Sequence, residues 1–371
     1  MKYKLITVVG TRPEIIRLSE IIKNLDQNFD HILVHTNQNY DKNLKDVFFK
    51  DLDIKKPKYD LNINAPNSIS TISKVLIGVE KIIKKEMPDA FFVLGDTNSA
   101  LSVIVAKKYK IPIFHYEAGN RCFDQRVPEE TNRKIVDHVS DINLTYSQFA
   151  RDNLISEGLA IDRVFNIGSP LGDVIENNEN KIKKSKIISK LNLKRKNFFL
   201  FSFHREENVD NKVRLKKFLT ILNKTAEIFN KKIIVSTHPR TQKRISKISF
   251  NQNKNISFCE PFGFIDYMRL QKDSLAVISD SGSISEEASY LSINAISLRD
   301  TIERQEAMSE TAVIMSSLDL DEFVNNLNLC IKGKKNKEII SDYKKKFIPE
   351  KISRIIHSYI PYVNKEVWKK Y

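Results

Sequence analysis

The sequence predicts an α/β protein made of two Rossmann-like, doubly wound domains that face each other across a cleft. Three observations predict this fold. Short apolar runs rich in β-branched residues alternate with longer stretches of helical spacing. The alternation stops at the hydrophilic segment 176–186 and then begins again. The chain has 371 residues, which is longer than a single core usually grows, so two domains are expected.

The first half is expected to contain six strands separated by helices. Helical spacing is clearest in residues 68–85 and 148–157, and a shorter helix is expected around residues 43–52. Strands that alternate with helices in this way form a parallel, doubly wound sheet. The expected strands are residues 5–9, 32–36, 90–94, 111–116, 142–146 and 164–167.

The second half repeats the pattern with five expected strands and a terminal helix. Domain boundaries are expected to give a first domain of residues 1–172 and a second of residues 173–350. Residues 351–371 carry helical spacing and are expected to pack back on the first domain. The five expected strands are residues 198–203, 233–237, 256–259, 275–279 and 295–298.

The stretch 111–141 joins a strand, a charged loop and a helix. Its strand ends at Glu117, and Pro128 with Glu129 and Glu130 opens the helix. Ligands of open α/β sheets bind outside the carboxyl ends of the strands, which is where Glu117 would lie. For Glu129 and Glu130, favourable interaction with the helix dipole explains the sequence about as well as a functional role.

Two further loops place polar side chains at expected strand ends. GTRPEIIR at residues 10–17 is a strand–turn–helix opening, and it lacks the G-x-G-x-x-G pattern of nicotinamide dinucleotide sites. Arg12 beside a helix N-terminus would suit an anion. Asp96 follows the strand at 90–94, where it would serve equally well as a helix cap or as a catalytic group.

In the second half, Asp280-Ser281-Gly282-Ser283 stands at an expected helix start. Backbone amides, two hydroxyls and close approach at Gly282 suit a phosphate or diphosphate. Cationic or imidazole side chains at other strand ends favour an anionic nucleotide as the ligand, and these are Arg12, His204, His238 and Arg299.

Neighbouring residues would bind the rest of a nucleotide. Glu287, one turn into the helix, could accept hydrogen bonds from ribose hydroxyls. Phe262 or Phe264 could pack on a base, although burial in the core is the commoner use of an aromatic side chain.

The carboxylates Asp96, Glu117 and Glu129 would face this nucleotide. Several carboxylates suggest proton transfer at a group attached to the nucleotide, whereas phosphoryl transfer would require a lysine-bearing phosphate loop and magnesium ligands. The sequence contains no G-x-x-x-x-G-K-[ST] loop.

Composition excludes several other classes. The net charge of +15 is spread over scattered lysine clusters without a nucleic-acid-binding module, so no nucleic-acid partner is expected. No stretch is apolar over the ~20 residues that a membrane span needs. A cytoplasmic protein without a membrane partner is therefore expected. The three cysteines, Cys122, Cys259 and Cys330, form no CxxC pair, and neither a metal site nor a cofactor is predicted.

Eight motifs occur in order over nearly the whole chain. They are GTRPEIIRLS at 10–19, GDTN at 95–98, HYEAGNRCFDQRVPEETNR at 115–133, HREEN at 204–208, STHPR at 236–240, EPFGFIDY at 260–267, SDSGSISEEA at 279–288 and LRDTIER at 298–304. Together these motifs are highly specific, and they resemble the non-hydrolysing UDP-N-acetylglucosamine 2-epimerase family.

The resemblance implies a glycosyltransferase-B-like fold, an isomerase acting on a UDP-sugar, and a homodimer. HTNQNYD at 35–41 and EAGNRCFDQRVPEETNR at 117–133 most resemble the branch that makes UDP-N-acetyl-L-fucosamine from UDP-2-acetamido-2,6-dideoxy-L-talose for capsule or O-antigen synthesis. The implied acid/base residues are Asp96, Glu117, Glu129 and His204. The implied UDP- or substrate-binding residues are Arg12, Gln38, Arg121, Arg133, His238, Phe262, Phe264, Ser281, Gly282, Ser283, Glu287 and Arg299.

One position departs from the family pattern. This chain has Arg17 where many members have lysine, and arginine keeps its charge, so we expect a fixed cation near the leaving diphosphate and no proton donor. Three alternatives stay open at this stage: a UDP-GlcNAc/UDP-ManNAc 2-epimerase, a UDP-sugar glycosyltransferase of the same architecture, and a binding protein without catalysis.

Overall fold

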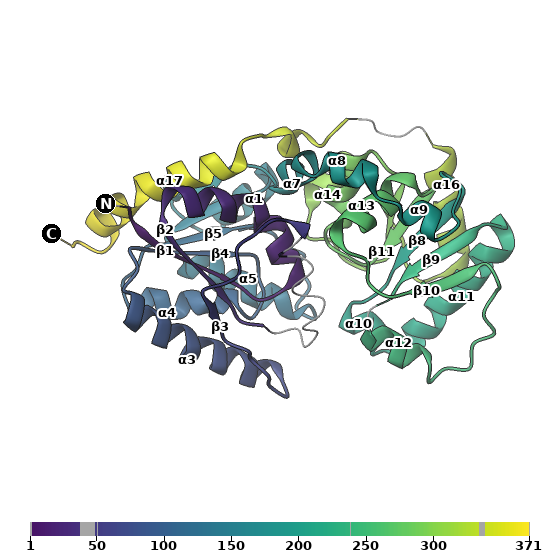
Figure 1. Cartoon of the computed structure of the whole chain (residues 1–371), viewed down its shortest axis with the longest axis horizontal. Coiled ribbons are helices and arrows are strands. Elements are labelled where there is room, and N and C mark those ends of the chain that lie inside the picture. The colour runs from purple at the N-terminus through teal and green to yellow at the C-terminus, as the bar shows by residue number, and fades with distance from the viewer. Residues whose placement is uncertain (1, 38–48, 50, 238, 334–337, 371) are drawn as a thin grey trace. The chain divides into compact units, whose positions relative to one another are not determined.

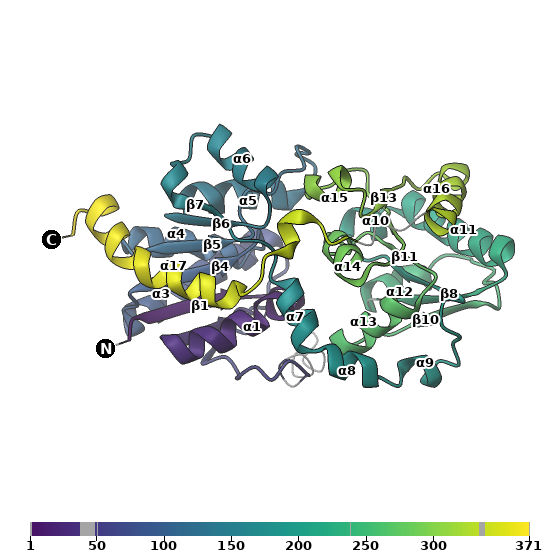
Figure 2. The same cartoon turned by 90° about the horizontal axis from the view of Figure 1, so that it is seen from above.

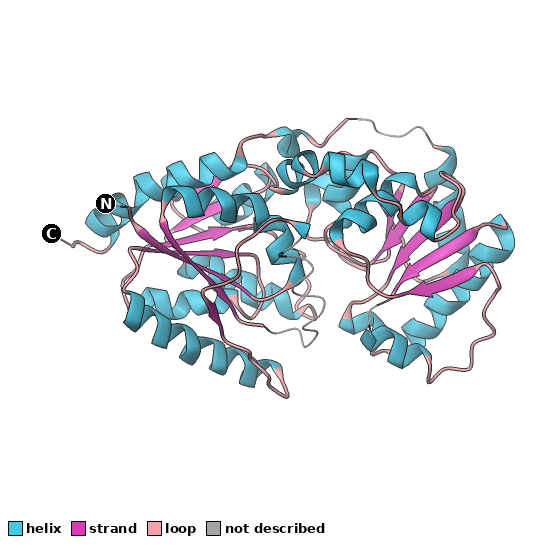
Figure 3. Cartoon of the chain, viewed as in Figure 1, coloured by secondary structure: helices cyan, strands magenta, loops and turns pink. Residues whose placement is uncertain are grey.

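The computed structural model describes residues 2–37, 49, 51–237, 239–333 and 338–370. The chain divides into two compact units: unit 1 comprises Met1–Asn177 and Ser341–Tyr371, and unit 2 comprises Asn178–Ile340. The divisions between the units fall after residues 177 and 340, whereas the sequence analysis places them after residues 172 and 350. Each unit contains a parallel sheet with helices, as Figures 1 and 3 show, so the prediction of two parallel-sheet α/β domains is confirmed.

The sheet of unit 1 has the strand order β3-β2-β1-β4-β5-β6-β7, and its strands are parallel. The chain runs outward from β1 through β2 to β3, and then resumes with β4 on the other side of β1. The order of the strands therefore reverses between β1 and β4. The strands are β1 (Lys4–Val9), β2 (Asp30–His35), β3 (Tyr59–Asp60), β4 (Ala90–Leu94), β5 (Ile113–Tyr116), β6 (Ile142–Thr145) and β7 (Val164–Asn166).

The central strands lack polar/apolar alternation because parallel strands are covered on both faces. All five residues of β4, AFFVL, are buried, and so are the last five of β1. The buried apolar residues of these strands pack with those of the covering helices, including Val75 and Val79.

Helices cover the sheet of unit 1 on both faces (Figures 1 and 2). On one face α1 packs against α7 and α17, and on the other α3 packs against α4. In α17 the residues Ile348, Ile352, Ile356 and Ile360 recur every four positions and are buried, which explains why this segment forms an amphipathic helix. The helices are α1 (Arg12–Asn28), α3 (Ser68–Glu86), α4 (Val103–Lys108), α5 (Pro128–Val139), α6 (Gln148–Ser156), α7 (Leu171–Asn177) and α17 (Ile348–Tyr362).

The sheet of unit 2 has the order β10-β9-β8-β11-β12-β13, again with parallel strands. Here the order reverses between β8 and β11. The strands are β8 (Phe198–Ser202), β9 (Lys232–Ser236), β10 (Ile256–Cys259), β11 (Ala276–Ser279), β12 (Ala295–Ser297) and β13 (Ile314–Met315).

The helices of unit 2 enclose a core rich in phenylalanine. Phe203 stacks on Phe218 with ring centroids 4.0 Å apart, and Phe323 packs near Phe201. Helix α11 packs against α16, while α13 packs against α8 and α9. The helices are α8 (Glu179–Lys184), α9 (Ile187–Lys190), α10 (Glu206–Val209), α11 (Lys212–Phe229), α12 (Pro239–Ile245), α13 (Phe264–Asp273), α14 (Ile284–Leu291), α15 (Gln305–Ser309) and α16 (Leu320–Lys332).

The structure adds two strands to those expected from the sequence. Both β3 and β13 are edge strands of two residues, too short to show a period in the sequence. The helix expected around residues 43–52 lies mostly outside the described residues. Within the described ranges, no helix combines the length and the apolar character needed to cross a membrane.

Two substitutions on helix α11 test the core of unit 2. Leu222 is 0% exposed and Ile228 is 53% exposed, so Leu222→Ala opens a cavity and Ile228→Ala does not. We expect Leu222→Ala to cost about 2–5 kcal/mol of stability and Ile228→Ala no more than about 0.5 kcal/mol. Urea unfolding followed by circular dichroism measures both, and equal losses would contradict the assignment of the core.

Candidate active site

In unit 1 the polar residues singled out from the sequence gather where the strand order reverses. Ligands of open α/β sheets bind at such switch points, outside the carboxyl ends of the strands. Arg12 begins α1 directly after β1, and Asp96 follows β4, the neighbouring strand. Glu117 follows β5, the next strand in the sheet. The parallel sheet thus brings three segments far apart in sequence to one edge.

Glu117 forms an ion pair with Arg17 of α1. The Nη1 atom of Arg17 donates to both carboxylate oxygens of Glu117, at 3.0 and 2.8 Å. The side chains are only 11% and 12% exposed, respectively, so the pair is largely shielded from water. Tyr146 donates a hydrogen bond to the same carboxylate at 3.4 Å. Arg17 therefore acts in this structure as a cation held against Glu117.

The backbone at Glu117 has an unusual conformation that directs this side chain. Its φ angle is +68°, which a residue other than glycine seldom adopts. Such strained conformations cluster at functional sites, because the surrounding structure must hold them in place. Gly95, with φ +71°, lies next to it, and a Cβ atom at residue 95 would approach Glu117 Oε2 to 3.5 Å.

Asp96 is bound by Arg133 of helix α5. The Nε and Nη2 atoms of Arg133 donate to Asp96 Oδ2 at 3.1 and 2.7 Å, and its Nη1 donates to Glu130 at 2.8 Å. Asp96 stays 29% exposed, whereas Arg133 is 5% exposed. Glu129, in the first turn of α5, is half-buried. The buried Arg133 therefore orients Asp96 and leaves part of the Asp96 carboxylate accessible to solvent.

Glu14, which sequence reasoning missed, connects the β1 and β4 loops. Its carboxylate accepts hydrogen bonds from the Gly10 and Thr11 amides at 3.1 and 2.7 Å, and from the Thr97 hydroxyl at 3.2 Å. Burial raises the pKa of Glu14 to about 7, and the hydrogen bonds from Thr11, Gly10 and Thr97 oppose the rise. The glutamate that follows Arg-Pro in GTRPE was the available signal, because a capping box needs one there.

Arg121 has a structural task, different from the substrate contact expected from the sequence. Its side chain is completely buried and donates to Asp137 at 2.7 Å and to Glu157 at 2.8 and 2.7 Å. Asp137 also lies 2.9 Å from Nδ1 of the buried His115, whose Nε2 lies 2.9 Å from the carbonyl oxygen of Gly95. This buried network braces the loop that carries Asp96. No feature of the sequence signals that Arg121 points inward.

In unit 2 the switch point between β8 and β11 carries His204 and Asp280. Asp280 is fully buried and accepts hydrogen bonds from the amides of His204 and Arg205 and from Asn208. The Nδ1 atom of His204 lies 3.1 Å from Asp280 Oδ1, and the imidazole is 44% exposed. Burial alone would raise the pKa of Asp280, but the charge and hydrogen bonds of His204, with those of Asn208 and Arg205, lower it to about 2.

This arrangement gives Asp280 a role that sequence reasoning missed. A carboxylate beside Nδ1 fixes the orientation of the ring and leaves Nε2 for other contacts. The sequence analysis places Asp280 only in a phosphate-binding turn. The available signal was a carboxylate, Asp280, directly after the apolar run that forms β11. That strand lies next to β8, which leads to HREEN.

The turn after β11 forms a chain of hydroxyl groups that ends on Glu287. Ser281 Oγ lies 2.9 Å from Ser283 Oγ, and Ser283 Oγ donates to Glu287 at 2.9 Å. Gln271 donates to the other oxygen of Glu287 at 2.8 Å. The structure therefore brings these predicted residues together at the start of α14, with Glu287 held by two partners.

Arg299 lies beside Gly282 and is paired with Glu303. Both terminal nitrogens of Arg299 donate to the Glu303 carboxylate, and Arg205 Nη2 approaches the same carboxylate at 3.5 Å. A Cβ atom added to Gly282 would lie 3.6 Å from Arg299 Nη1 and 3.9 Å from Arg205 Nη2. Two guanidinium groups thus flank the glycine turn. An anion bound there would interact with both, in place of or alongside Glu303.

The remaining predicted residues divide into two groups. Phe264 is 3% exposed and belongs to the apolar interior of unit 2, while Phe262 is half-buried in the loop between β10 and α13. Gln38 and His238 lie outside the described residues. Of the two aromatics, Phe262 is the one with surface left to contact a base.

The low pKa of Asp280 predicts an acid-dependent loss of stability. The ordinary pKa of this carboxyl group is 3.8, whereas its pKa in the folded protein is about 2. A carboxylate with such a shift stabilises the fold fully above about pH 4, and this contribution is lost as the pH falls toward 2. The shift corresponds to on the order of 2 kcal/mol. We expect Asp280→Asn to be less stable than the parent at pH 6 and to lose this difference by pH 2.

Urea unfolding at several pH values measures this effect. Asp300→Asn serves as the control, because the Asp300 side chain is 46% exposed and pairs only at the surface with Arg214. A stability difference for Asp280→Asn that does not change with pH would show that Asp280 is not the titrating group.

Comparisons with known proteins agree with this geometry. A family model described as UDP-N-acetylglucosamine 2-epimerase matches residues 23–360. A solved structure of UDP-N-acetylglucosamine 2-epimerase from Rickettsia bellii is 42% identical, with a TM-score of 0.94 and 100% of both chains covered. The Methanocaldococcus jannaschii UDP-GlcNAc 2-epimerase, solved in complex with UDP-GlcNAc and UDP, is 36% identical, with a TM-score of 0.88 and coverage of 96% of this chain and 99% of that one.

A further relative is named for a different sugar. The UDP-2,3-diacetamido-2,3-dideoxy-D-glucuronate 2-epimerase of Pseudomonas aeruginosa is 32% identical over 329 residues, covering 87% of this chain and 91% of the relative. A family model that matches most of the chain, together with relatives above 30% identity over most of their length, shows the family. The chain belongs to the UDP-N-acetylglucosamine 2-epimerase family.

Proposed function

We propose that this protein inverts C2 of a UDP-2-acetamido sugar by eliminating UDP and adding it back. The observation that carries the proposal is the pairing of two carboxylates, the partly exposed Asp96 and the largely shielded Glu117, with arginines at one switch point. UDP-sugar 2-epimerase activity is the activity of the family. The residue roles below are our assignments.

Chemistry requires the C1–O bond to break during the reaction. The hydrogen at C2 of an acetamido sugar is not next to a carbonyl carbon, so a carbanion formed there would have no stabilisation. If the bond from C1 to the diphosphate breaks as the proton leaves, the electron pair from C–H forms a C1–C2 double bond. UDP then departs with the C1–O electrons, and a glycal remains. Re-addition of UDP to C1 and of a proton to the other face of C2 completes the inversion.

The groups at the unit 2 switch point suit the departing diphosphate. Donors fixed before the reaction stabilise a developing charge without reorganising. Ser281 and Ser283 supply hydroxyls, and Arg299 supplies a guanidinium whose present partner, Glu303, is an anion. We assign Arg12, at the N-terminus of α1, to the same task. Glu287 is assigned to the ribose hydroxyls and Phe262 to the base.

The carboxylates at the unit 1 switch point suit the two proton transfers. Inversion needs one group to remove a proton and another to deliver one to the opposite face, so a single base is insufficient. We assign these roles to Asp96, Glu117 and Glu129, with His204 as a further acid/base group and Arg133 as the residue that positions Asp96.

Two substrates follow from different observations. The motifs HTNQNYD and EAGNRCFDQRVPEETNR favour UDP-2-acetamido-2,6-dideoxy-L-talose, which would give UDP-N-acetyl-L-fucosamine for a capsule or O-antigen. The relatives of 42% and 36% identity are named for UDP-N-acetylglucosamine, which favours that substrate about as well. Incubating the protein with each sugar nucleotide separately distinguishes them. The homodimer and the cytoplasmic location stay predictions.

Turnover in deuterium oxide tests the mechanism. Because the base exchanges its proton with solvent before re-protonation of the glycal, we expect deuterium at C2 of the product. NMR of the product, formed from either UDP-sugar without any acceptor, measures it. A glycosyltransferase would instead need an acceptor, so conversion of the UDP-sugar alone excludes that alternative.

Glu117→Gln serves as the companion variant. It keeps the shape of the side chain but removes the proton-accepting carboxylate, and general acid–base groups typically contribute about 10²–10⁴-fold to rate. We expect turnover to fall by at least about a hundredfold while calorimetry shows unchanged UDP binding. In the deuterium oxide experiment, product of the parent protein that retains all of its C2 hydrogen would rule out exchange with solvent and support a shielded or redox transfer.

Arg17→Lys tests the role of the fixed cation. Lysine can keep the charge at this position, but it lacks the planar guanidinium group whose Nη1 donates to both oxygens of Glu117. We expect turnover to fall by about tenfold with the pH profile retained. A lysine variant of higher activity with a new titration at alkaline pH would show that a proton donor is required at this position.

A further inference from the structure

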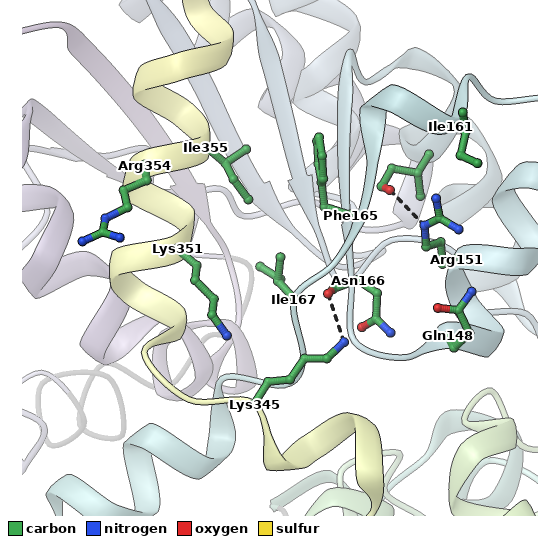
Figure 4. Close-up of a pocket in the computed structure, with 11 residues that line it drawn as sticks. Gln148, Arg151, Ile161, Phe165, Asn166, Ile167, Lys345, Lys351, Arg354 and Ile355 are labelled. Atoms are coloured by element: carbon green, nitrogen blue, oxygen red, sulfur yellow. Dashed lines mark hydrogen bonds between the residues drawn. The ribbon is translucent and has the colours of Figure 1, made fainter.

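A pocket of about 640 Å³ lies in unit 1 outside the candidate active site. It is formed by the edge strand β7, the helix α6, the segment that leads into α17 and α17 itself (Figure 4). None of the residues assigned above to the UDP-sugar lines it. Its volume falls within the range of roughly 300–1,000 Å³ that is typical of small-molecule sites.

The charged side chains that line this pocket are all cationic. Arg151, Lys345, Lys351 and Arg354 come from three separate segments, and no carboxylate is among the lining residues. Asp342 supplies a counter-charge, 3.6 Å from the amine of Lys345. In the described part of the chain, neither Lys351 nor Arg354 forms an ion pair. The pocket therefore has a surplus of positive charge that the described residues do not neutralise.

Holding these cations together has a measurable electrostatic cost. Lys345 is half-buried, with its amine bonded to the Asn166 carbonyl at 3.0 Å. Burial lowers the pKa of Lys345, the charge of Asp342 opposes this, and repulsion by Lys351 adds to it. A bound anion would offset both the desolvation and the repulsion.

The wall between the cations is apolar. Phe165, Ile167 and Ile355 lie between Lys351 on one side and Arg151 on the other, as Figure 4 shows. The amines of Lys345 and Lys351 lie on either side of Ile167 in this view, while the Arg354 guanidinium lies at the outer edge. Ile161, at the far side, is 63% exposed. A ligand that matched this surface would carry both a charged head and an apolar body.

We propose that this pocket binds a small anion with a phosphate-like head group and an apolar substituent. The head group contacts Lys345 and Lys351, and the substituent packs on Phe165, Ile167 and Ile355. The proposal is independent of the epimerase reaction, because the pocket shares no residue with the site of that reaction. A phosphomonoester fits better than a nucleic acid, since the cations line one concave pocket and do not extend as a stripe along the surface.

Calorimetry with 1-naphthyl phosphate tests the proposal on the full-length protein saturated with UDP, which keeps the probe out of the nucleotide site. We expect one probe bound per chain. Inorganic phosphate, which lacks the apolar group, and 1-naphthol, which lacks the charge, should each bind at least about tenfold more weakly. Affinity should also fall as salt is raised, because the attraction is electrostatic.

Lys351→Gln is the decisive variant. The Lys351 side chain has no hydrogen-bond or ion-pair partner among the described residues, so its replacement should leave the fold intact, which circular dichroism checks. Loss of a hydrogen bond to a charged group should weaken binding of 1-naphthyl phosphate by about tenfold or more. Lys81→Gln, which removes a lysine charge from an exposed position of helix α3 outside the pocket, is the control and should bind as the parent does.

Three results would overturn the proposal. Unchanged affinity in Lys351→Gln would place the probe elsewhere on the protein. Equal affinity for inorganic phosphate would show that the apolar wall takes no part. Absence of binding by the parent protein at millimolar probe would show that the cationic pocket is only a solvated surface.

Discussion

Parallel pairing of strands on both sides of the first strand is the constraint on which the rest of this structure depends. It sends every strand of a sheet in the same direction, so all the carboxyl ends open on one edge. Because β1 and β4 are neighbours although 80 residues of sequence separate Lys4–Val9 from Ala90–Leu94, their two loops meet. The same rule brings the loop after β8 to the turn after β11. The local sequence determines which side chains each loop carries, and the pairing of the strands determines which loops are adjacent.

Gathering charges at one edge creates a second problem, which the arginines solve. Carboxylates placed close together repel one another and lose hydration when partly buried. Asp96 and Glu130 share Arg133, and Glu117 is matched by Arg17. In unit 2 the relation is reversed, because there the anion Glu303 is the partner of Arg299. A ligand anion at the proposed site would therefore have to exchange one ion pair for another.

Much of the fold could be predicted from the sequence, because it depends on patterns that a single segment displays. The apolar runs gave eleven strands close to their observed bounds, and Ala90–Leu94 agrees at both ends. The strands β3 and β13 could not be found, since two residues show no period and owe their conformation to the neighbouring strand. Residues at strand ends were identifiable for the same reason, since the end of an apolar run is visible in the sequence.

What could not be predicted is the direction in which a polar side chain points. Arg121 and Arg126 stand in the same loop, yet the first is completely buried with Asp137 and Glu157, while the second has a side chain that is 79% exposed. The partners of Arg121 are 16 and 36 residues away in sequence, so the choice is made by tertiary packing. The same holds for Glu14, whose partner Thr97 belongs to another loop. Residue type restricts the possible roles, and the partners across the sheet select among them.

The two switch points differ in the chemistry they offer, and this difference has a physical origin. The unit 1 edge presents carboxylates held by cations beneath them, which suits accepting a proton from carbon. The unit 2 edge presents hydroxyls, a glycine turn and guanidinium groups, which suits an anionic leaving group. Under the proposed roles, a proton acceptor and a diphosphate site on one edge would compete, because arginines that bound the diphosphate would also pair with the carboxylates. Apart from Arg12, the proposed diphosphate donors belong to the sheet of unit 2, so each set of charges can be arranged for its own task.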